Sequence, residues 1–260
     1  MIIEKDFSCM KGNMTVRGRE LYDDSLNERK DPVIISHGFT SCMKYTRDYG
    51  VFLAEQGYHA YIFDFCGGGF ETVSDGSFED YMTPLTEVDD LKTVISYVQV
   101  QPDVNADRLI LIGCSQGGFV SALTAAGLRE QIFGLILLYP ALCIPDDARA
   151  GSMQIIRFDS TNIPAHIGEG RMRISGAYAS SVLHMNVFDD IRYYKGHVLL
   201  VHGTDDQIVS YGYSLAAESV YQRNGADVTL KLIENAPHGF RGKDFDVSCE
   251  IIASWLKGLQ

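Results

Sequence analysis

Short apolar runs alternate with longer amphipathic stretches along most of the chain. Runs that are apolar at nearly every position are typical of parallel strands buried on both faces, with helices covering each side. The pattern therefore predicts an α/β fold with a mostly parallel central sheet. Strands are predicted at 32–36, 60–65, 108–112, 134–139, 197–202 and 227–233, and helices at 45–56, 84–101, 117–128, 211–224 and 244–259.

Three segments depart from this alternation. Residues 1–21 predict two strands joined at 11–13, an antiparallel start to the sheet, and a charged loop follows at 23–31. Residues 141–196 separate two core strands by far more than one helix and its short connections require. They mix aromatic and polar residues, which suits a lid over a binding site. We expect one domain over 1–260, with a cap inserted at 141–196.

The pattern G-x-S-x-G occupies residues 113–117, between an apolar run and a helical stretch. A sharp turn in that setting lifts a serine hydroxyl clear of the sheet, an arrangement known as a nucleophile elbow. Glycines suit the turn because the serine backbone is strained and neighbouring side chains would meet the adjoining strand or helix. Ser115 is therefore the candidate nucleophile. The other interpretation is an ordinary helix N-cap serine, since the pattern also arises by chance.

An acid and a base follow Ser115 in a characteristic order. Asp205 and Asp206 come just after the apolar run 197–202, and His238 lies on a loop before the last predicted helix. The order Ser, Asp, His is that of the α/β-hydrolases and differs from the orders in chymotrypsin and subtilisin. The positions of the serine, the aspartates and the histidine together predict catalysis by a nucleophilic serine that a histidine activates.

With these residues in place, the chain resembles the α/β-hydrolase superfamily over nearly all its length. A closer likeness is carried by His37-Gly38-Phe39-Thr40, Ser115-Gln116-Gly117-Gly118, His202-Gly203-Thr204-Asp205-Asp206 and Ile208-Val209-Ser210. Through these segments the chain is similar, within the superfamily, to the small bacterial feruloyl (cinnamoyl) esterases. It departs from that group at Cys114, where His is frequent, and at the loop 64–70, which lacks the usual His and Ser.

The resemblance implies an α/β-hydrolase fold with an inserted cap (lid) subdomain and a triad whose acid is Asp206, leaving Asp205 as a solvated turn residue. An acyl-transfer reaction also needs hydrogen-bond donors for the oxyanion. We expect these to be the backbone N–H groups of Phe39 and Gln116. The loop His37-Gly38-Phe39, which carries the first of these donors, is here called the oxyanion loop. His37 and His202 both follow strands, and we expect them to be structural hydrogen-bonding residues near this loop.

The resemblance also implies that polar groups of the inserted segment bind the hydroxyl groups of a phenolic ring. Asp147 and Gln154 fall at the matching positions, although surface turn residues are an equal alternative for both. Dienelactone hydrolases use a cysteine at the elbow, but here the tip is Ser115. We therefore expect Cys114 to face the core as a small apolar side chain.

The net charge of the chain limits the classes of partner that we expect it to bind. A formal net charge of −12 argues against nucleic acid and anionic membranes, and favours a small-molecule substrate. The six cysteines lie far apart without a C-x-x-C pair, as expected for reduced thiols in the cytoplasm. No secretory signal is indicated at the start of this sequence, nor a run of about 18 apolar residues that would span a membrane. A homodimer remains open.

The expected function is that of a cytoplasmic serine carboxylesterase that releases hydroxycinnamates such as ferulate from small esters, without metal or cofactor. A general short-chain carboxylesterase or monoacylglycerol lipase is the nearest alternative. A serine aminopeptidase shares the same triad. A non-catalytic binding protein is the most distant alternative, because such proteins usually lack a triad residue.

Overall fold

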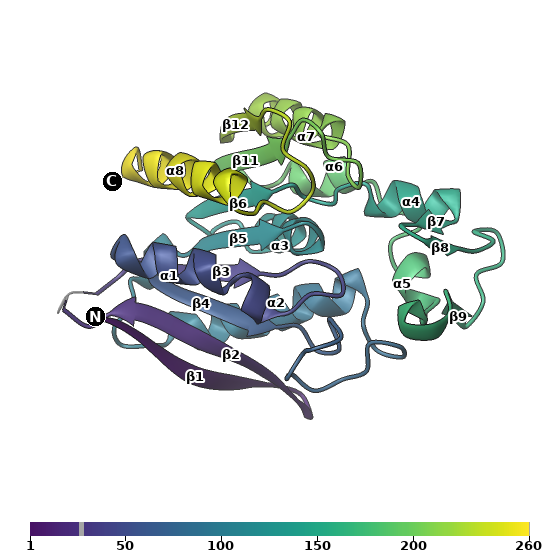
Figure 1. The fold of residues 1–260 in the computed structure, drawn as a ribbon, viewed down its shortest axis with the longest axis horizontal. Helices are drawn as coiled ribbons and strands as arrows, with labels where there is room; N and C mark the ends of the chain where they lie inside the picture. Colours follow the sequence, from purple (N-terminus) through teal and green to yellow (C-terminus); the bar gives the residue numbers. More distant parts are fainter. Residues whose placement is uncertain (26–28, 260) are drawn as a thin grey trace.

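The computed structural model describes residues 1–25 and 29–259. Within them, eight strands form the central sheet in the order β1-β2-β4-β3-β5-β6-β11-β12 (Figure 1). β1 and β2 form an antiparallel hairpin, β2 pairs antiparallel with β4, and every other neighbouring pair is parallel. The strands are β1 (Ile2–Lys11), β2 (Met14–Asp23), β3 (Pro32–Ser36), β4 (His59–Asp64), β5 (Ile110–Cys114), β6 (Gly134–Leu138), β11 (His197–Gly203) and β12 (Asp227–Ile233).

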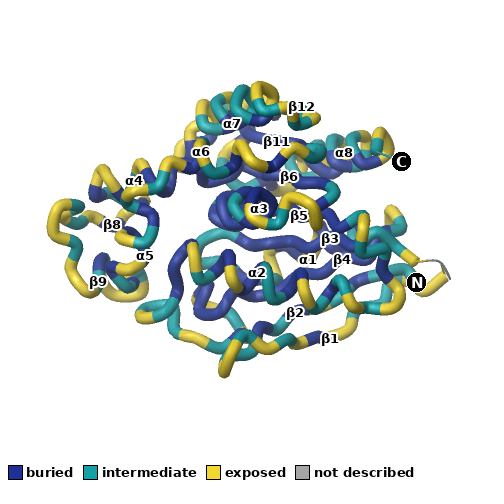
Figure 2. Tube along the Cα trace, turned by 180° about the vertical axis from the view of Figure 1, so that it is seen from behind, coloured by how far each residue is buried: buried dark blue, intermediate teal, exposed yellow. Residues whose placement is uncertain are grey.

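Helices cover both faces of this sheet. Successive side chains of a strand point to opposite faces, so each buried strand contributes to two separate apolar clusters. In β3, for example, Ile34 belongs to one cluster and Val33 and Ile35 belong to the other. Figure 2 shows the central strands as the most buried part of the trace. The first cluster packs against α2 (Pro84–Gln99), α3 (Gln116–Gly127) and α7 (Gly212–Arg223), and the second against α1 (Arg47–Glu55) and α8 (Lys243–Lys257).

The predicted α/β-hydrolase fold class is confirmed, with small differences at element boundaries. The strand predicted at 108–112 lies two residues later, because a short 3₁₀ turn, Ala106–Arg108, precedes β5. Further 3₁₀ turns occupy Met43–Tyr45 and Gly170–Met172. Of the charged loop predicted at 23–31, residues 26–28 lie outside the described residues, as does the last residue of the predicted domain, 260.

The segment between β6 and β11 builds a lobe beside the sheet (Figure 1). Its interior side chains, among them Ile156, Ile174 and Tyr178, are buried and continue the apolar cluster beneath α2 and α3. Its last helix, α6, packs back against α3 and α7. The elements of this segment are α4 (Ile144–Ala150), β7 (Ser152–Met153), β8 (Ile156–Arg157), β9 (His166–Ile167), β10 (Ile174–Ser175), α5 (Ala177–Ser180) and α6 (Val187–Ile191).

None of the described helices combines the length and the apolar character that crossing a membrane requires.

Candidate active site

Ser115 stands on a tight turn between β5 and α3. Its backbone has φ 55° and ψ −117°, a strained conformation for a residue with a side chain. The glycines around it are required by close contacts. A Cβ at Gly113 would lie 2.2 Å from the carbonyl oxygen of Gly117, and a Cβ at Gly117 would lie 2.4 Å from the carbonyl oxygen of Ser36. The turn therefore presents the Ser115 hydroxyl at the C-terminal edge of the sheet.

The structure brings Ser115, His238 and Asp206 together. His238 Nε2 lies 2.9 Å from Ser115 Oγ, and His238 Nδ1 lies 2.7 Å from Asp206 Oδ2. A carboxylate only accepts hydrogen bonds, so Nδ1 carries the ring hydrogen and Nε2 is left to accept from the serine hydroxyl. The ring of Tyr139 packs edge-on against His238, with centroids 4.9 Å apart, and holds the imidazole from one side.

Asp206 is buried and all its lone pairs face donors. Oδ1 accepts hydrogen bonds from the backbone N–H groups of Ile208 and Val209, at 2.9 and 2.8 Å, while Oδ2 accepts from His238 and, at 3.0 Å, from His202 Nε2. Burial alone would raise the pKa of Asp206, but the hydrogen bonds from His202, His238 and Val209 outweigh it and lower the pKa well below the ordinary value. The carboxylate is therefore ionised throughout the physiological pH range.

His202 has a different place from the one predicted. It contacts Asp206 instead of the oxyanion loop, because it lies near the end of β11 with its ring directed toward the turn that follows. Its Nε2 faces two acceptors, Asp206 Oδ2 and the Val209 carbonyl oxygen, both at 3.0 Å, so it must carry a hydrogen. Its Nδ1 lies 2.7 Å from Ser214 Oγ on α7, which fixes the ring from the other side.

Asp205, the rival acid, is exposed and accepts a hydrogen bond from the side chain of its neighbour Gln207. It does not contact His238, whereas Asp206 does. The geometry thus distinguishes Asp206, which contacts His238, from Asp205, whereas their order in the sequence did not show which of the two would contact the histidine.

The loop after β3 approaches Ser115 from the other side. A Cβ at Gly38 would lie 3.1 Å from the Cβ of Ser115, so only glycine lets the loop come this near without displacement. The N–H groups of Phe39, on this loop, and of Gln116, at the start of α3, donate no hydrogen bond to another described residue. Two unpaired donors beside a serine hydroxyl can stabilise an oxyanion.

His37 supports this loop, as expected. Its Nδ1 lies 2.9 Å from the carbonyl oxygen of Gly38, and its Nε2 accepts a hydrogen bond from the backbone N–H of Phe65 at 3.2 Å. Burial lowers the pKa of His37, so the ring is uncharged and serves as a fixed donor and acceptor. It ties the loop after β3 to the loop after β4.

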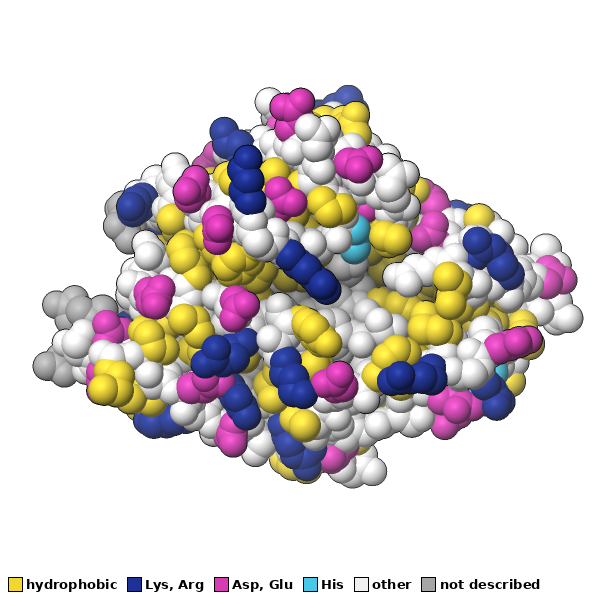
Figure 3. Space-filling model, viewed as in Figure 1, with side chains coloured by type: hydrophobic (Ala, Val, Ile, Leu, Met, Phe, Trp, Pro, Cys, Tyr) yellow, Lys and Arg dark blue, Asp and Glu magenta, His cyan; other side chains and the backbone are white. Residues whose placement is uncertain are grey.

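Two cavities meet at Ser115. The first, here called the insertion-side cavity, has a volume of about 440 Å³ and lies between Ser115 and the inserted segment; Asp147, Met153 and Tyr178 are among its lining residues. The second, the loop-side cavity, has a volume of about 620 Å³ and extends past His238 toward Lys44 and Arg241. Figure 3 shows hydrophobic side chains gathered in the hollow between the sheet and the lobe. A serine between two cavities can receive the two halves of an ester.

Comparison with known proteins gives the family of the chain and structures that share its fold. The family model described as serine aminopeptidase, S33, a hydrolase family, matches residues 27–166. The chain belongs to this family. Est1E from Butyrivibrio proteoclasticus, solved with ferulic acid bound, is 26% identical over 97% of this chain and 98% of that chain, with a TM-score of 0.88. A likeness over 97% of the hydrolase extends into the inserted segment.

More distant structures share the fold. The esterase Pf2001 from Pyrococcus furiosus is 22% identical over 98% of this chain and 92% of that chain, with a TM-score of 0.74. The mouse α/β hydrolase domain-containing protein 10 is 19% identical over 98% and 100% of the two chains, with a TM-score of 0.77. No curated protein sequence matches the hydrolase.

The two substrate-binding candidates of the hydrolase lie on the insertion-side cavity. Asp147, on α4, is half-buried. Burial raises its pKa, partly offset by a hydrogen bond with the Cys143 thiol. Gln154 is exposed, has a positive φ of 51°, and lines both cavities. Both residues therefore line a cavity that Ser115 also lines.

Sequence reasoning counts Tyr178 among the aromatic residues that suit a lid but gives it no individual role; in the structure it lines the insertion-side cavity. Its ring packs edge-on against the Phe39 ring, with centroids 5.6 Å apart, and its hydroxyl donates a hydrogen bond to the Gln116 side chain. Tyr178 lies 63 positions after Ser115 in the chain, within a segment of very short elements. Its place at the site can be recognised only from its contact with Gln116 in the structure.

Cys114 faces the core, as expected. It is 6% exposed and belongs to the apolar cluster under α1 and α8. Burial raises the pKa of its thiol to about 12, which keeps it protonated and unreactive.

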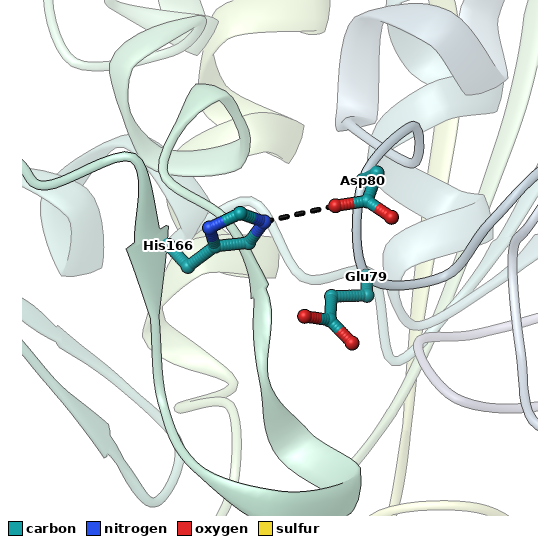
Figure 4. A group of neighbouring side chains, drawn as sticks. All are labelled: Glu79, Asp80 and His166. Atoms are coloured by element: carbon teal, nitrogen blue, oxygen red, sulfur yellow. Dashed lines mark hydrogen bonds and ion pairs between the residues drawn. The ribbon is translucent and has the colours of Figure 1, made fainter.

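Among the described residues, Glu79, Asp80 and His166 are the one group of three side chains with metal-ligand atoms close together, all within 4.8 Å (Figure 4). His166, on β9, already pairs with Asp80 at 2.9 Å, and Glu79 pairs with Arg173 at 3.1 Å. These partly exposed pairs join the inserted segment to the loop before α2. We interpret the group as an ion-pair contact between lobe and core.

Proposed function

We propose that the chain is a serine carboxylesterase that hydrolyses hydroxycinnamoyl esters of the feruloyl type through an acyl-enzyme. The observation that carries the proposal is the insertion-side cavity, in which a half-buried carboxyl group, Asp147, shares a small space with the Ser115 hydroxyl. The likeness to Est1E, which has been solved with ferulic acid, supports an aromatic acid as the ligand of that cavity.

In the proposed reaction Ser115 Oγ attacks the ester carbonyl carbon while its proton passes to His238 Nε2. The ionised Asp206 holds the imidazole in the required tautomer and stabilises the imidazolium without taking the proton. The backbone N–H groups of Phe39 and Gln116 stabilise the tetrahedral oxyanion. His238 then protonates the departing alcohol, and a water molecule, activated by the same ring, hydrolyses the acyl-enzyme.

Selection of the acid would come from the insertion-side cavity. The rings of Phe39 and Tyr178 offer apolar walls to a planar aryl group. At the same cavity Asp147 is an acceptor for the para-hydroxyl group of a feruloyl ring, and Gln154 is a second polar contact. The volume of about 440 Å³ falls within the range usual for small-molecule sites.

The test compares feruloyl and unsubstituted cinnamoyl methyl esters with the wild type and Asp147→Ala. We expect kcat/KM for the feruloyl ester, relative to that for the cinnamoyl ester, to fall about tenfold in Asp147→Ala, because one hydrogen bond to a half-buried carboxyl group is lost. Asp146→Ala is the matched control, since Asp146 is exposed, pairs with Arg149 and does not line the insertion-side cavity. An unchanged ratio in Asp147→Ala contradicts recognition of the phenol.

One competing function has an observation in its favour. The matching family model carries the description serine aminopeptidase, and the same triad can cleave an aminoacyl amide. A panel of aminoacyl amides, butyryl and longer acyl esters, and feruloyl esters separates that function and a general carboxylesterase or monoacylglycerol lipase from ours. Covalent labelling of Ser115 by a fluorophosphonate excludes a non-catalytic binding protein.

The cellular setting is part of the proposal. All six cysteines are free, which supports a reducing compartment such as the cytoplasm.

A further inference from the structure

A buried row of polar side chains runs from the inserted segment to α2 beneath the elbow. The Tyr178 hydroxyl donates to Gln116 Oε1, and Gln116 Nε2 donates to Glu87 Oε2 at 2.8 Å. Tyr178 and Gln116 are 2% and 1% exposed, and Glu87 is completely buried. Both ends of the Gln116 side-chain amide are thereby occupied, and its orientation is fixed.

Glu87 is an unusual residue for its position. It is buried on α2 among the apolar residues Val88, Leu91 and Val94. Within the part of the chain that the structure describes, the other buried acid of this helix, Asp90, has a cation partner in Lys11 that Glu87 lacks. Its second oxygen, Oε1, is buried without a hydrogen-bond partner among the described residues. Burial raises the pKa of Glu87 well above its usual range, against a smaller lowering by the hydrogen bond from Gln116, so the buried site favours the uncharged form of the carboxyl group.

Gln116 holds the peptide that matters most for the proposed chemistry. Its backbone N–H belongs to the peptide that follows the strained residue Ser115, and it is one of the two unpaired donors beside the hydroxyl. Donors of an oxyanion hole act through their fixed placement, and a displacement of about 1 Å is costly. Tyr178 also packs against Phe39, the residue that carries the other donor. The row thus reaches both donors.

We propose that Glu87 is a positioning residue for the oxyanion hole. Its carboxyl group accepts a hydrogen bond from the amide nitrogen of the Gln116 side chain, while the Tyr178 hydroxyl donates one to the amide oxygen, and together they fix Gln116. The inference rests on the proposed serine hydrolase function but not on the feruloyl specificity. It assigns a role to a buried carboxyl group on α2 that the proposed reaction does not itself use. It also links the inserted segment to the elbow through the side chain of Gln116.

The experiment compares three variants of the full chain. Glu87→Leu removes the acceptor at nearly constant volume, Glu87→Gln keeps a neutral acceptor, and Val94→Ala opens a cavity elsewhere on the buried face of α2. For Glu87→Leu we expect kcat on the best ester to fall about tenfold with KM changed less than about twofold, because the donor peptide is less fixed. Glu87→Gln is expected to restore kcat, and Val94→Ala to lose stability without losing kcat.

A second readout separates positioning from loss of structure. Phenylboronic acid forms a tetrahedral adduct with a serine hydroxyl and so mimics the oxyanion intermediate. We expect its affinity to fall in Glu87→Leu by about the same factor as kcat/KM, as for a lost transition-state interaction, while Val94→Ala binds it normally.

Three outcomes overturn the inference: unchanged kcat and boronate affinity in Glu87→Leu, an equal loss in Val94→Ala, or a Glu87→Gln variant as impaired as Glu87→Leu. A wild type that neither turns over any ester nor binds the boronate overturns the proposed function first, and this inference with it. A wild type active on esters other than feruloyl ones overturns only the substrate class.

Discussion

The elbow and the inserted segment are built in different ways although they face each other across one cavity. Around Ser115 the backbone is strained, glycines at 113 and 117 allow contacts that no Cβ would tolerate, and Asp206 is saturated with donors. The inserted segment has two-residue strands and short helices. It meets the loop before α2 through partly exposed ion pairs. Its contacts with the elbow include the hydrogen bond from the Tyr178 hydroxyl and that from the Ala141 backbone N–H to the Ser115 carbonyl oxygen, and α6 packs on α3.

Because of this difference, we expect the elbow region to carry out the reaction and the inserted segment to select the substrate. Groups that must hold sub-ångström geometry come from turns and loops that follow the strands of the central sheet, where packing over-determines their positions. The groups that we propose select a substrate come from a segment of short elements and loops, and loops tolerate sequence change. Substitutions in the first region should therefore reduce turnover of every ester, and substitutions in the second should change the preference among esters.

The largest expected effect tests the first region at Asp206. Asp206→Asn keeps the size of the side chain but offers its amide N–H₂ group toward His238 or His202, so the imidazole loses its required tautomer. We expect kcat to fall about 10³- to 10⁴-fold. Asp205→Asn, one residue away and exposed, is expected to retain kcat and serves as control. Steady-state kinetics on any ester that the wild type hydrolyses measures kcat of both variants. A loss of kcat in Asp205→Asn comparable to that in Asp206→Asn would show that Asp206 is not the specific acid of the triad.

The strand-based part of this site could be predicted from the sequence because its signals are local. An apolar run, a glycine-flanked serine and an aspartate just after a strand each define a position at the sheet edge, and the parallel topology brings those edges together. The sequence order alone left Asp205 and Asp206 open, and the structure separates them by burial and by contact with His238.

Other parts could not be predicted, because their positions depend on contacts distant in sequence. His202 was expected near the oxyanion loop, but its ring direction at the end of β11 brings it to Asp206 instead. Glu87 occupies a helix face that periodicity assigns to apolar residues, and no pattern marks it as a partner of Gln116. Tyr178 belongs to a segment whose strands are too short to show any periodicity.

The next expected effect concerns acid stability. The pKa of Asp206 is lower in the folded state than its ordinary value, so its hydrogen bonds stabilise the fold fully above the unfolded-state pKa and are lost as pH falls through the folded-state pKa. Hydrogen bonds to a charged group are each worth about 2 kcal/mol. The free energy of unfolding should therefore be lower in Asp206→Asn than in the wild type above about pH 5, and the difference should shrink below about pH 4.

Denaturant unfolding from pH 7 down to pH 3 measures this difference, with Asp205→Asn again as control. A difference that stays constant over the whole range would show that Asp206 stabilises the fold through packing and not through its charge.

Gly38→Ala is expected to have a moderate effect on turnover. The added Cβ lies 3.1 Å from the Cβ of Ser115, so the oxyanion loop or the serine must shift by a few tenths of an ångström. We expect kcat to fall about tenfold, since small misplacements of donors weaken the transition state more than the ground state. Gly127→Ala at the end of α3 meets nothing within 4 Å and should leave kcat unchanged. Full activity in Gly38→Ala would mean that the loop is not needed at this distance.

The smallest expected effects lie at the junction between lobe and core. Asp80→Ala removes the pair with His166, and Glu79→Ala removes the pair with Arg173; the four side chains are 30% to 66% exposed. Partly exposed pairs are worth at most about 1 kcal/mol, so each variant should lower Tm slightly and leave kcat intact. If the double variant instead changes the ratio of kcat/KM between feruloyl and cinnamoyl esters, the ion pairs help to set the shape of the insertion-side cavity. In that case the lobe selects its substrate through its attachment to the core as well as through Asp147 and Tyr178, and chemistry and selection are less separate than the structure alone indicates.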